Sequence, residues 1–65
     1  MVYMAAFEEG KELVVYCYDI KEKFIEDVFK MKFEGKRVVK TGLNEIDVHD
    51  ICKRRGLSAK IIKIE

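Results

Sequence analysis

The stretch 28-VFKMKFEGKRVVKT-41 fits two different secondary structures, and the order of the elements depends on which of them forms. Read as strands, its first half alternates apolar and basic side chains, and Glu34-Gly35 forms the turn of a hairpin. Read as the end of a helix, the same residues continue the apolar positions before them, and Gly35 supplies the left-handed residue that closes the helix. The sequence favours a hairpin with strands 28–33 and 36–41, since a helix through these residues places lysines inside its own apolar arc.

Residues 2–7 and 12–18 predict another hairpin near the start of the chain. Both segments are rich in Val, Tyr and other strand formers, and the EEGK between them is typical of a short turn. With residues 8–11 as the loop, Phe7 pairs with Glu12. Because side chains alternate across a strand, two sets of residues face opposite sides of the sheet. One side carries Val2, Met4, Ala6, Leu13, Val15 and Cys17, and the other carries Tyr3, Phe7, Val14, Tyr16 and Tyr18.

A helix is expected between the two hairpins. Asp19 followed by Glu22 has the spacing of a capping box, in which each side chain accepts a hydrogen bond from the other residue's backbone amide. Apolar residues then recur at helical spacing. The predicted helix spans about residues 20–27, and in the longer reading it continues to Gly35.

A second helix and a last strand complete the chain. Asn44 is a preferred N-cap residue, and Asp47 lies at the third helical position, near the cap. Gly56 fits the position just after the helix, and residues 53–55 place three cations in the last turn, where the helix dipole favours positive charge. Residues 59–64 read as a strand.

These elements predict a small α+β domain with the order ββαββαβ, or ββαβαβ if the first helix is long. Each helix has only one apolar side to bury, so we expect a single-layer sheet with two helices packed on one face. A chain of 65 residues forms one domain with a thin core, and no linker divides residues 1–65.

Composition narrows the class of protein. Charged residues make up 38% of the chain and Gln is absent, a profile typical of heat-adapted proteins. No segment resembles a signal peptide, and no apolar run approaches the roughly 18 residues of a membrane span. We therefore expect a soluble, cytoplasmic protein that does not contact the membrane. Cys17 and Cys52 fit free thiols in a reducing compartment.

No motif assigns an enzymatic, metal or cofactor role. His49 and Cys52 are neighbours on the second predicted helix, but a zinc site needs three or four ligands and none follows at the usual spacing. The two EGK turns are too short to cradle a phosphate. Adjacent carboxylates such as Glu26 and Asp27 do not converge on one point of a helix surface. We expect neither a catalytic residue nor a bound cofactor.

The two parts of the chain differ in charge more than the total shows. Residues 1–27 carry three basic and seven acidic residues, a net charge of −4, whereas residues 28–65 carry ten basic and five acidic residues, a net charge of +5. A basic segment attracts phosphates even when the total charge is near zero. This asymmetry indicates contact with nucleic acid through the second part of the chain.

The preferred hairpin places a candidate nucleic-acid site on the helix-free face of the sheet. Proteins that bind single strands stack aromatic rings on bases and hold phosphates with Lys and Arg. The sequence therefore predicts contact with RNA or single-stranded DNA. The predicted site consists of Tyr3, Tyr16, Tyr18, Lys30, Lys32, Lys36, Arg37, Lys40 and Lys63, with a secondary basic patch at Lys53, Arg54 and Arg55.

The same aromatic face supports an alternative hypothesis. Tyrosines are common on exposed sheet faces, and lysines protect edge strands from aggregation. An aromatic face that also carries Phe7 and Val14 suits a two-fold dimer interface, which adds buried area to a small core. The alternative is thus a homodimeric or partner-binding protein-interaction module, and we expect a homodimer under either hypothesis.

Overall fold

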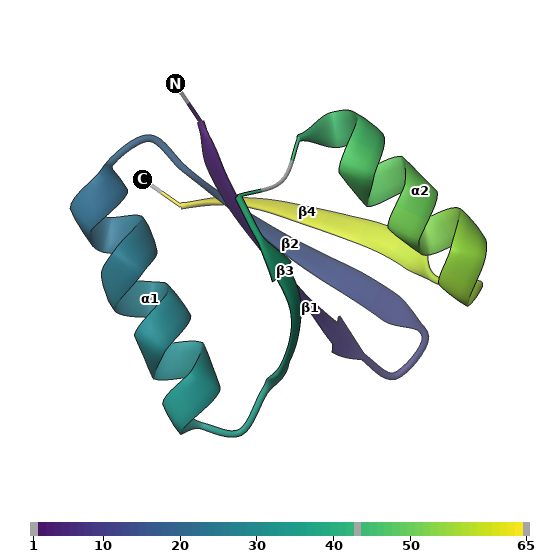
Figure 1. Cartoon of the computed structure of the whole chain (residues 1–65), viewed down its shortest axis with the longest axis horizontal. Coiled ribbons are helices and arrows are strands. Elements are labelled where there is room, and N and C mark those ends of the chain that lie inside the picture. Colours follow the sequence, from purple (N-terminus) through teal and green to yellow (C-terminus); the bar gives the residue numbers. More distant parts are fainter. Residues whose placement is uncertain (1, 43, 65) are drawn as a thin grey trace.

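Four strands and two helices form the chain, in the order ββαβαβ (Figure 1). The computed structural model describes residues 2–42 and 44–64, without the side chains of Lys40 and Thr41. The strands are β1 (Tyr3–Glu9), β2 (Glu12–Tyr18), β3 (Arg37–Thr41) and β4 (Ser58–Ile64), and the helices are α1 (Lys21–Phe33) and α2 (Glu45–Arg55). The fold is therefore the small α+β domain with the longer first helix.

Residues 28–33 are helical, which corrects the preferred hairpin prediction. The end of α1 is a Schellman arrangement: the Lys36 amide donates to the Met31 carbonyl at 3.0 Å, and the Gly35 amide donates to the Lys32 carbonyl at 3.1 Å. Gly35 has a φ of 78°, in the left-handed region that glycine adopts at little cost. The lysines expected inside the apolar arc of this helix are exposed. The helix directs a different side toward the sheet than its apolar pattern indicated.

The two helices begin differently. The N-cap of α1 is Ile20, and no side chain caps it, so the predicted capping box at Asp19 does not form. In α2 the capping box is complete: Asn44 Oδ1 accepts from the Asp47 amide at 2.9 Å, and Asp47 Oδ2 accepts from the Asn44 amide at 3.2 Å. The helix ends at Gly56, as predicted, with a φ of 66°.

The sheet has the strand order β3-β1-β2-β4. β1 is antiparallel to both β2 and β3, whereas β2 and β4 are parallel. The turn between β1 and β2 consists of Gly10 and Lys11, so Phe7 pairs with Val14 and not with Glu12. This register differs from the predicted one by two residues. A shift of two leaves every side chain on its predicted face, because strand side chains alternate with a period of two.

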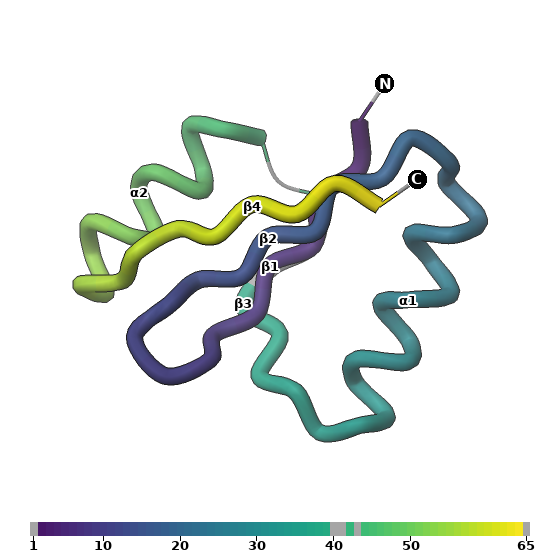
Figure 2. The backbone as a smooth tube through the Cα atoms, turned by 180° about the vertical axis from the view of Figure 1, so that it is seen from behind, coloured from purple at the N-terminus to yellow at the C-terminus, as the bar shows by residue number. Residues whose placement is uncertain are grey.

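The two helices cover opposite faces of the sheet, which corrects the expectation that both pack on one face (Figures 1 and 2). On one face Val48 and Ile51 of α2 pack against Ala6, Leu13, Val15 and Cys17. On the other face Met31 of α1 packs against Phe7 and Val14. Both faces of the central strands are apolar, so each face needs a helix to cover it.

The connectivity explains why the two helices lie on opposite faces of the sheet. β2, β3 and β4 run in one direction and β1 runs against them. The crossover through α1 leads from β2 past β1 to one edge of the sheet, and the crossover through α2 leads back to the opposite edge. Two crossovers of the same hand that travel in opposite directions place their helices on opposite faces.

Gly35→Ala tests the end of α1. Alanine must adopt the left-handed backbone that glycine adopts freely, so we expect the free energy of unfolding to fall by about 1 kcal/mol. Glu34→Ala is the matched control, because Glu34 is exposed and has a right-handed φ of −76°. Its effect should stay within about 0.5 kcal/mol. Urea unfolding measures both changes, and equal effects would contradict a helix that closes at Gly35.

Candidate functional site

The aromatic face of the sheet forms a core beneath α1 and is not an open platform. Tyr18 is only 1% exposed, and Tyr3 and Tyr16 are half-buried. Phe24 of α1 stacks on Tyr3 at 5.6 Å between ring centroids and meets Tyr18 edge to face at 5.7 Å. Tyr16 bridges Tyr18 and Phe7, at 6.4 and 5.4 Å. These rings hold α1 on the sheet, so the helix-free aromatic face predicted for nucleic acid or for a dimer is absent.

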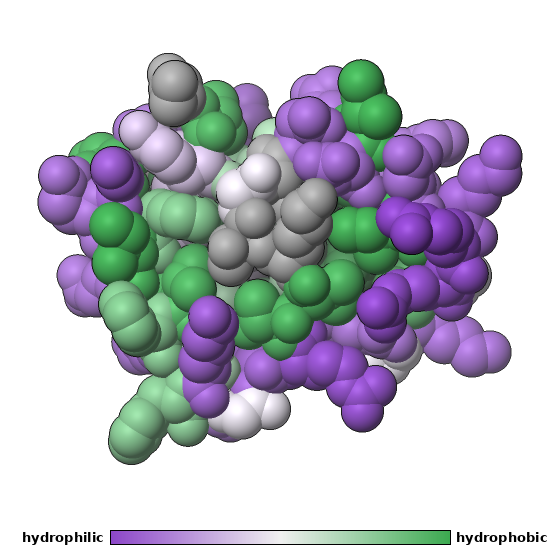
Figure 3. Space-filling model, in the orientation of Figure 1, coloured by the Kyte–Doolittle hydropathy of each residue, from purple (hydrophilic) through white to green (hydrophobic). Residues whose placement is uncertain are grey.

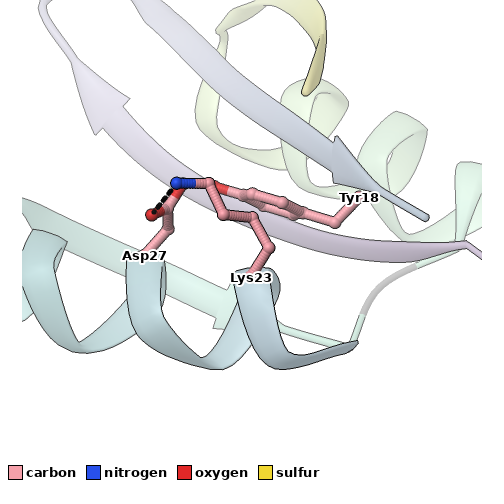
Figure 4. Close-up of polar contacts among 3 residues, drawn as sticks. All are labelled: Tyr18, Lys23 and Asp27. Atoms are coloured by element: carbon pink, nitrogen blue, oxygen red, sulfur yellow. Dashed lines mark hydrogen bonds and ion pairs between the residues drawn. The ribbon is translucent and has the colours of Figure 1, made fainter. Parts of the chain in front are cut away.

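A polar network adds to this anchor (Figure 4). The Tyr18 hydroxyl donates to Asp27 Oδ2 at 3.0 Å, and Lys23 Nζ lies 3.5 Å from Asp27 Oδ1. Burial raises the pKa of Tyr18, and the hydrogen bond to Asp27 raises it further. Both carboxylate oxygens of Asp27 have partners within the chain. The network therefore positions α1 and does not offer a free acid or base.

The outward side of α1 is apolar. Ile25, Phe29 and Phe33 lie four residues apart and share one side of the helix, and we call these three residues the α1 stripe. Their exposed fractions are 43%, 70% and 92%. Figure 3 shows hydrophobic residues along the outer edge of the helix, at the left of the view. Met31 is the single buried residue of α1, whereas all three residues of the stripe are exposed.

Charged residues border the α1 stripe, and the sign of their charge changes from the start of the helix to its end. One flank carries Glu22, Glu26 and Lys30 at four-residue spacing, acidic toward the helix start and basic toward its end. The other flank carries Lys32. None of these four side chains forms an ion pair within the part of the chain that the structure describes. Their charges are therefore available to a partner that docks on the stripe.

Sequence reasoning missed this stripe, although a signal for it exists. Phe24, Val28 and Met31 lie on the sheet side of α1, and the stripe lies on the other side. A helix with apolar residues on both sides has more apolar surface than one sheet face can cover. Two apolar arcs on one helix thus indicate a second partner.

The cations predicted for nucleic acid are spread over the molecule. Lys30 and Lys32 lie on α1. Arg37 begins β3 and Lys63 lies in β4, and these two strands form opposite edges of the sheet. The side chain of Lys40 lies outside the part that the structure describes. The predicted primary site is therefore not one continuous surface.

Lys36 is engaged within the chain. It follows α1, and its Nζ lies 4.8 Å from the centroid of the Phe7 ring. The same atom lies 4.0 Å from Oε2 of Glu9. A cation over an aromatic ring and beside a carboxylate contributes to packing, so this lysine helps to hold the loop between α1 and β3 on the sheet.

The secondary basic patch stays together. Lys53, Arg54 and Arg55 occupy the last turn of α2 and are exposed. Arg55 Nη1 donates to Glu8 Oε2 at 3.3 Å. Glu8 of β1 also lies opposite Arg37 of β3 in the sheet, which brings Arg37 beside the patch. Of these four cations, three form no ion pair among the described residues: Lys53, Arg54 and Arg37.

The thiols lie in the other core. Cys17 and Cys52 are free and both belong to the cluster beneath α2. Burial raises the pKa of the Cys17 thiol, which keeps it protonated at neutral pH. Among residues 2–42 and 44–64, with the side chains of Lys40 and Thr41 left aside, no group of three or more His, Cys, Asp or Glu residues is placed to hold a metal ion.

Comparisons of the chain with models of protein families, with curated proteins and with solved structures found no match. The helices within residues 2–42 and 44–64 are too short and too polar to cross a membrane. The candidate functional surfaces of the described residues are the α1 stripe and the basic patch of α2.

Tyr18 predicts how stability changes in alkaline solution. Its pKa in the folded chain lies above the ordinary value of 10.0. The stabilisation that Tyr18 contributes is complete below that ordinary pKa and is lost as the pH rises beyond it, because the unfolded chain then ionises first. We expect the free energy of unfolding in urea to fall above pH 10, and to fall less steeply in Tyr18→Phe.

Tyr16→Phe is the matched control for that measurement. Tyr16 belongs to the same row of rings, and the change Tyr16→Phe leaves the hydrogen bond between Tyr18 and Asp27 intact. It should therefore retain the full alkaline decrease. At neutral pH, Tyr18→Phe should lower the free energy of unfolding by about 1 kcal/mol through the lost hydrogen bond. Identical alkaline curves for Tyr18→Phe and the unaltered protein would contradict this role.

Proposed function

We propose that this protein is a protein-interaction module that recognises its partner through the α1 stripe. The observation that carries the proposal is the exposure of Phe29 and Phe33 on the outward side of one helix. Apolar side chains scattered singly over a surface are ordinary, whereas contiguous apolar surface is typical of an interaction site. Burial of each phenylalanine contributes roughly 1.5–3 kcal/mol in favour of binding.

The fold does not itself require the α1 stripe. The inner side of α1 is already anchored by Phe24, Asp27 and Met31. The stripe presents apolar anchors at successive turns of a helix, which is how an amphipathic helix engages a partner surface. Large aromatic anchors also supply much of the energy in protein interfaces. The structure of α1 thus supports recognition by a helix face that the chain's own core leaves free.

Site-specific crosslinking tests this function. A photoreactive benzoylphenylalanine in place of Phe29 should crosslink to a partner protein in the cells that produce the chain. The same group in place of Ile46, which is 72% exposed on α2, is the matched control and should not crosslink. A second change in the same chain, Phe33→Gln, should strongly reduce the product from position 29. Crosslinking that is equal at both positions, or that persists with Phe33→Gln, would contradict the proposal.

Binding of RNA or single-stranded DNA is the second candidate function that we propose. The observation that favours it is the group of cations at the end of α2 that form no ion pair among the described residues, where Arg37 joins Lys53 and Arg54. Exposed Lys and Arg side chains hold phosphates and release counterions, so this surface suits a nucleic-acid backbone. Base stacking does not support this candidate, because the tyrosines pack beneath α1.

Oligonucleotide titrations at low and moderate salt test the second candidate. Changing Arg37, Lys53 and Arg54 together to Ser should weaken binding about tenfold or more and make the salt slope shallower by about one for each lost phosphate contact. A variant with Lys21, Lys60 and Lys63 changed to Ser is the control, since it removes the same charge elsewhere. Absence of salt-sensitive binding by the unaltered chain, or equal losses in both variants, would exclude this site.

A further inference from the structure

We infer that the partner of the α1 stripe is a second copy of this chain, docked as an antiparallel pair of α1 helices around a two-fold axis near Phe29. This inference rests on the proposed function, because it names the partner of the same surface. It draws on three features of α1: the spacing of its apolar side chains, the order of its charges and its position in the fold.

The α1 stripe is complementary to itself. In an antiparallel pair centred on Phe29, Ile25 of each copy faces Phe33 of the other, since both lie four residues from the centre. A large aromatic side chain thus meets a smaller aliphatic one on either side of the axis. Ridges of side chains at four-residue spacing on both helices pack into each other's grooves at a crossing angle of about −50°. The spacing of the stripe is the spacing of such a ridge.

The charges beside the stripe favour the antiparallel orientation. Glu26 and Lys30 lie on one flank, on either side of the centre of α1. An antiparallel pair brings Glu26 of each copy toward Lys30 of the other, and the two-fold axis repeats this contact. In a parallel two-fold pair the same flanks of the two copies lie on opposite sides of the interface, so Glu26 of one copy cannot reach Lys30 of the other. Because neither side chain has an ion pair within the described chain, the contact breaks none.

The position of α1 allows two copies to meet. Figure 1 shows α1 at one side of the molecule, with the sheet and α2 on the side away from its outer surface. The stripe buries on the order of 400 Å² of apolar area per copy if each fully buried ring contributes about 200 Å². Stable interfaces bury about 800 Å² per partner, so the pair is a weak dimer that forms in the micromolar range or above.

Sedimentation equilibrium tests the role of the stripe. From about 10 μM to about 1 mM, the unaltered chain should pass from monomer toward dimer. Phe29→Gln should weaken this association by about tenfold or more, because it places a polar group on the axis. Ile46→Gln changes an exposed apolar residue of α2 and should leave association unchanged. Circular dichroism of dilute samples confirms that each variant is folded.

A charge exchange tests the orientation. Glu26→Lys and Lys30→Glu should each weaken association by about five- to tenfold, since each places like charges together at two contacts. The double variant Glu26→Lys with Lys30→Glu should recover the association of the unaltered chain. An equimolar mixture of the two single variants should also recover it, as a heterodimer. Double-variant association no stronger than that of the single variants would overturn the antiparallel arrangement.

The outcomes separate this inference from the proposed function. A chain that stays monomeric to about 1 mM, or that associates equally well with Phe29→Gln, overturns the self-pairing. If the probe at position 29 then crosslinks to a different protein and Phe33→Gln prevents it, the interaction module stands with another partner. If the chain is monomeric and the probe at position 29 gives no product, both conclusions fail. Oligonucleotide binding by a dimer that Phe29→Gln dissociates leaves the self-pairing standing, since the basic patch lies at the end of α2.

Discussion

Contacts with the sheet fix the orientation of α1 about its own axis, and this orientation determines which side of the helix reaches solvent. Phe24 lies against Tyr3 and Tyr18, and the Tyr18 hydroxyl donates to Asp27 one turn later. Met31 completes the contact two turns beyond Phe24. These residues define which side of the helix faces the sheet. The opposite side, which carries the α1 stripe, is therefore exposed to solvent. Its apolar side chains contribute free energy only when a partner covers them.

Covering both faces of the sheet decides where function can reside. Because α1 and α2 take opposite faces, a helix packs on each face of the central strands and neither face is a bare platform for another sheet. What remains are the outer sides of the helices and the two edge strands. Among these surfaces, the outer side of α1 is apolar and the end of α2 is basic. The two surfaces lie on different sides of the molecule, so they can serve a dimer and a polyanion without competing.

Local rules predicted the parts of the fold that local chemistry controls. The alternation in β1 and β2 assigned the side chains to the correct faces. Asn44 and Gly56 mark the two ends of α2, as their capping chemistry indicates. The helix through residues 28–33 was mispredicted, because an alternating pattern and an outward apolar arc look the same in a short stretch. The opposite placement of the helices depends on strand order, which no local pattern reveals. With α1 covering the tyrosines, the candidate site lies on the outer side of α1 and not on the tyrosine face.

Nuclear Overhauser contacts between copies test whether the outer side of α1 pairs with itself. A concentrated mixture of isotope-labelled and unlabelled chains allows contacts between different copies to be separated from contacts within one copy. We expect the methyl groups of Ile25 in one copy to contact the Phe33 ring of another, with Phe29 rings in mutual contact. Intermolecular contacts confined to other surfaces, such as Ile46 or Ile61, or no intermolecular contacts at all, would contradict it.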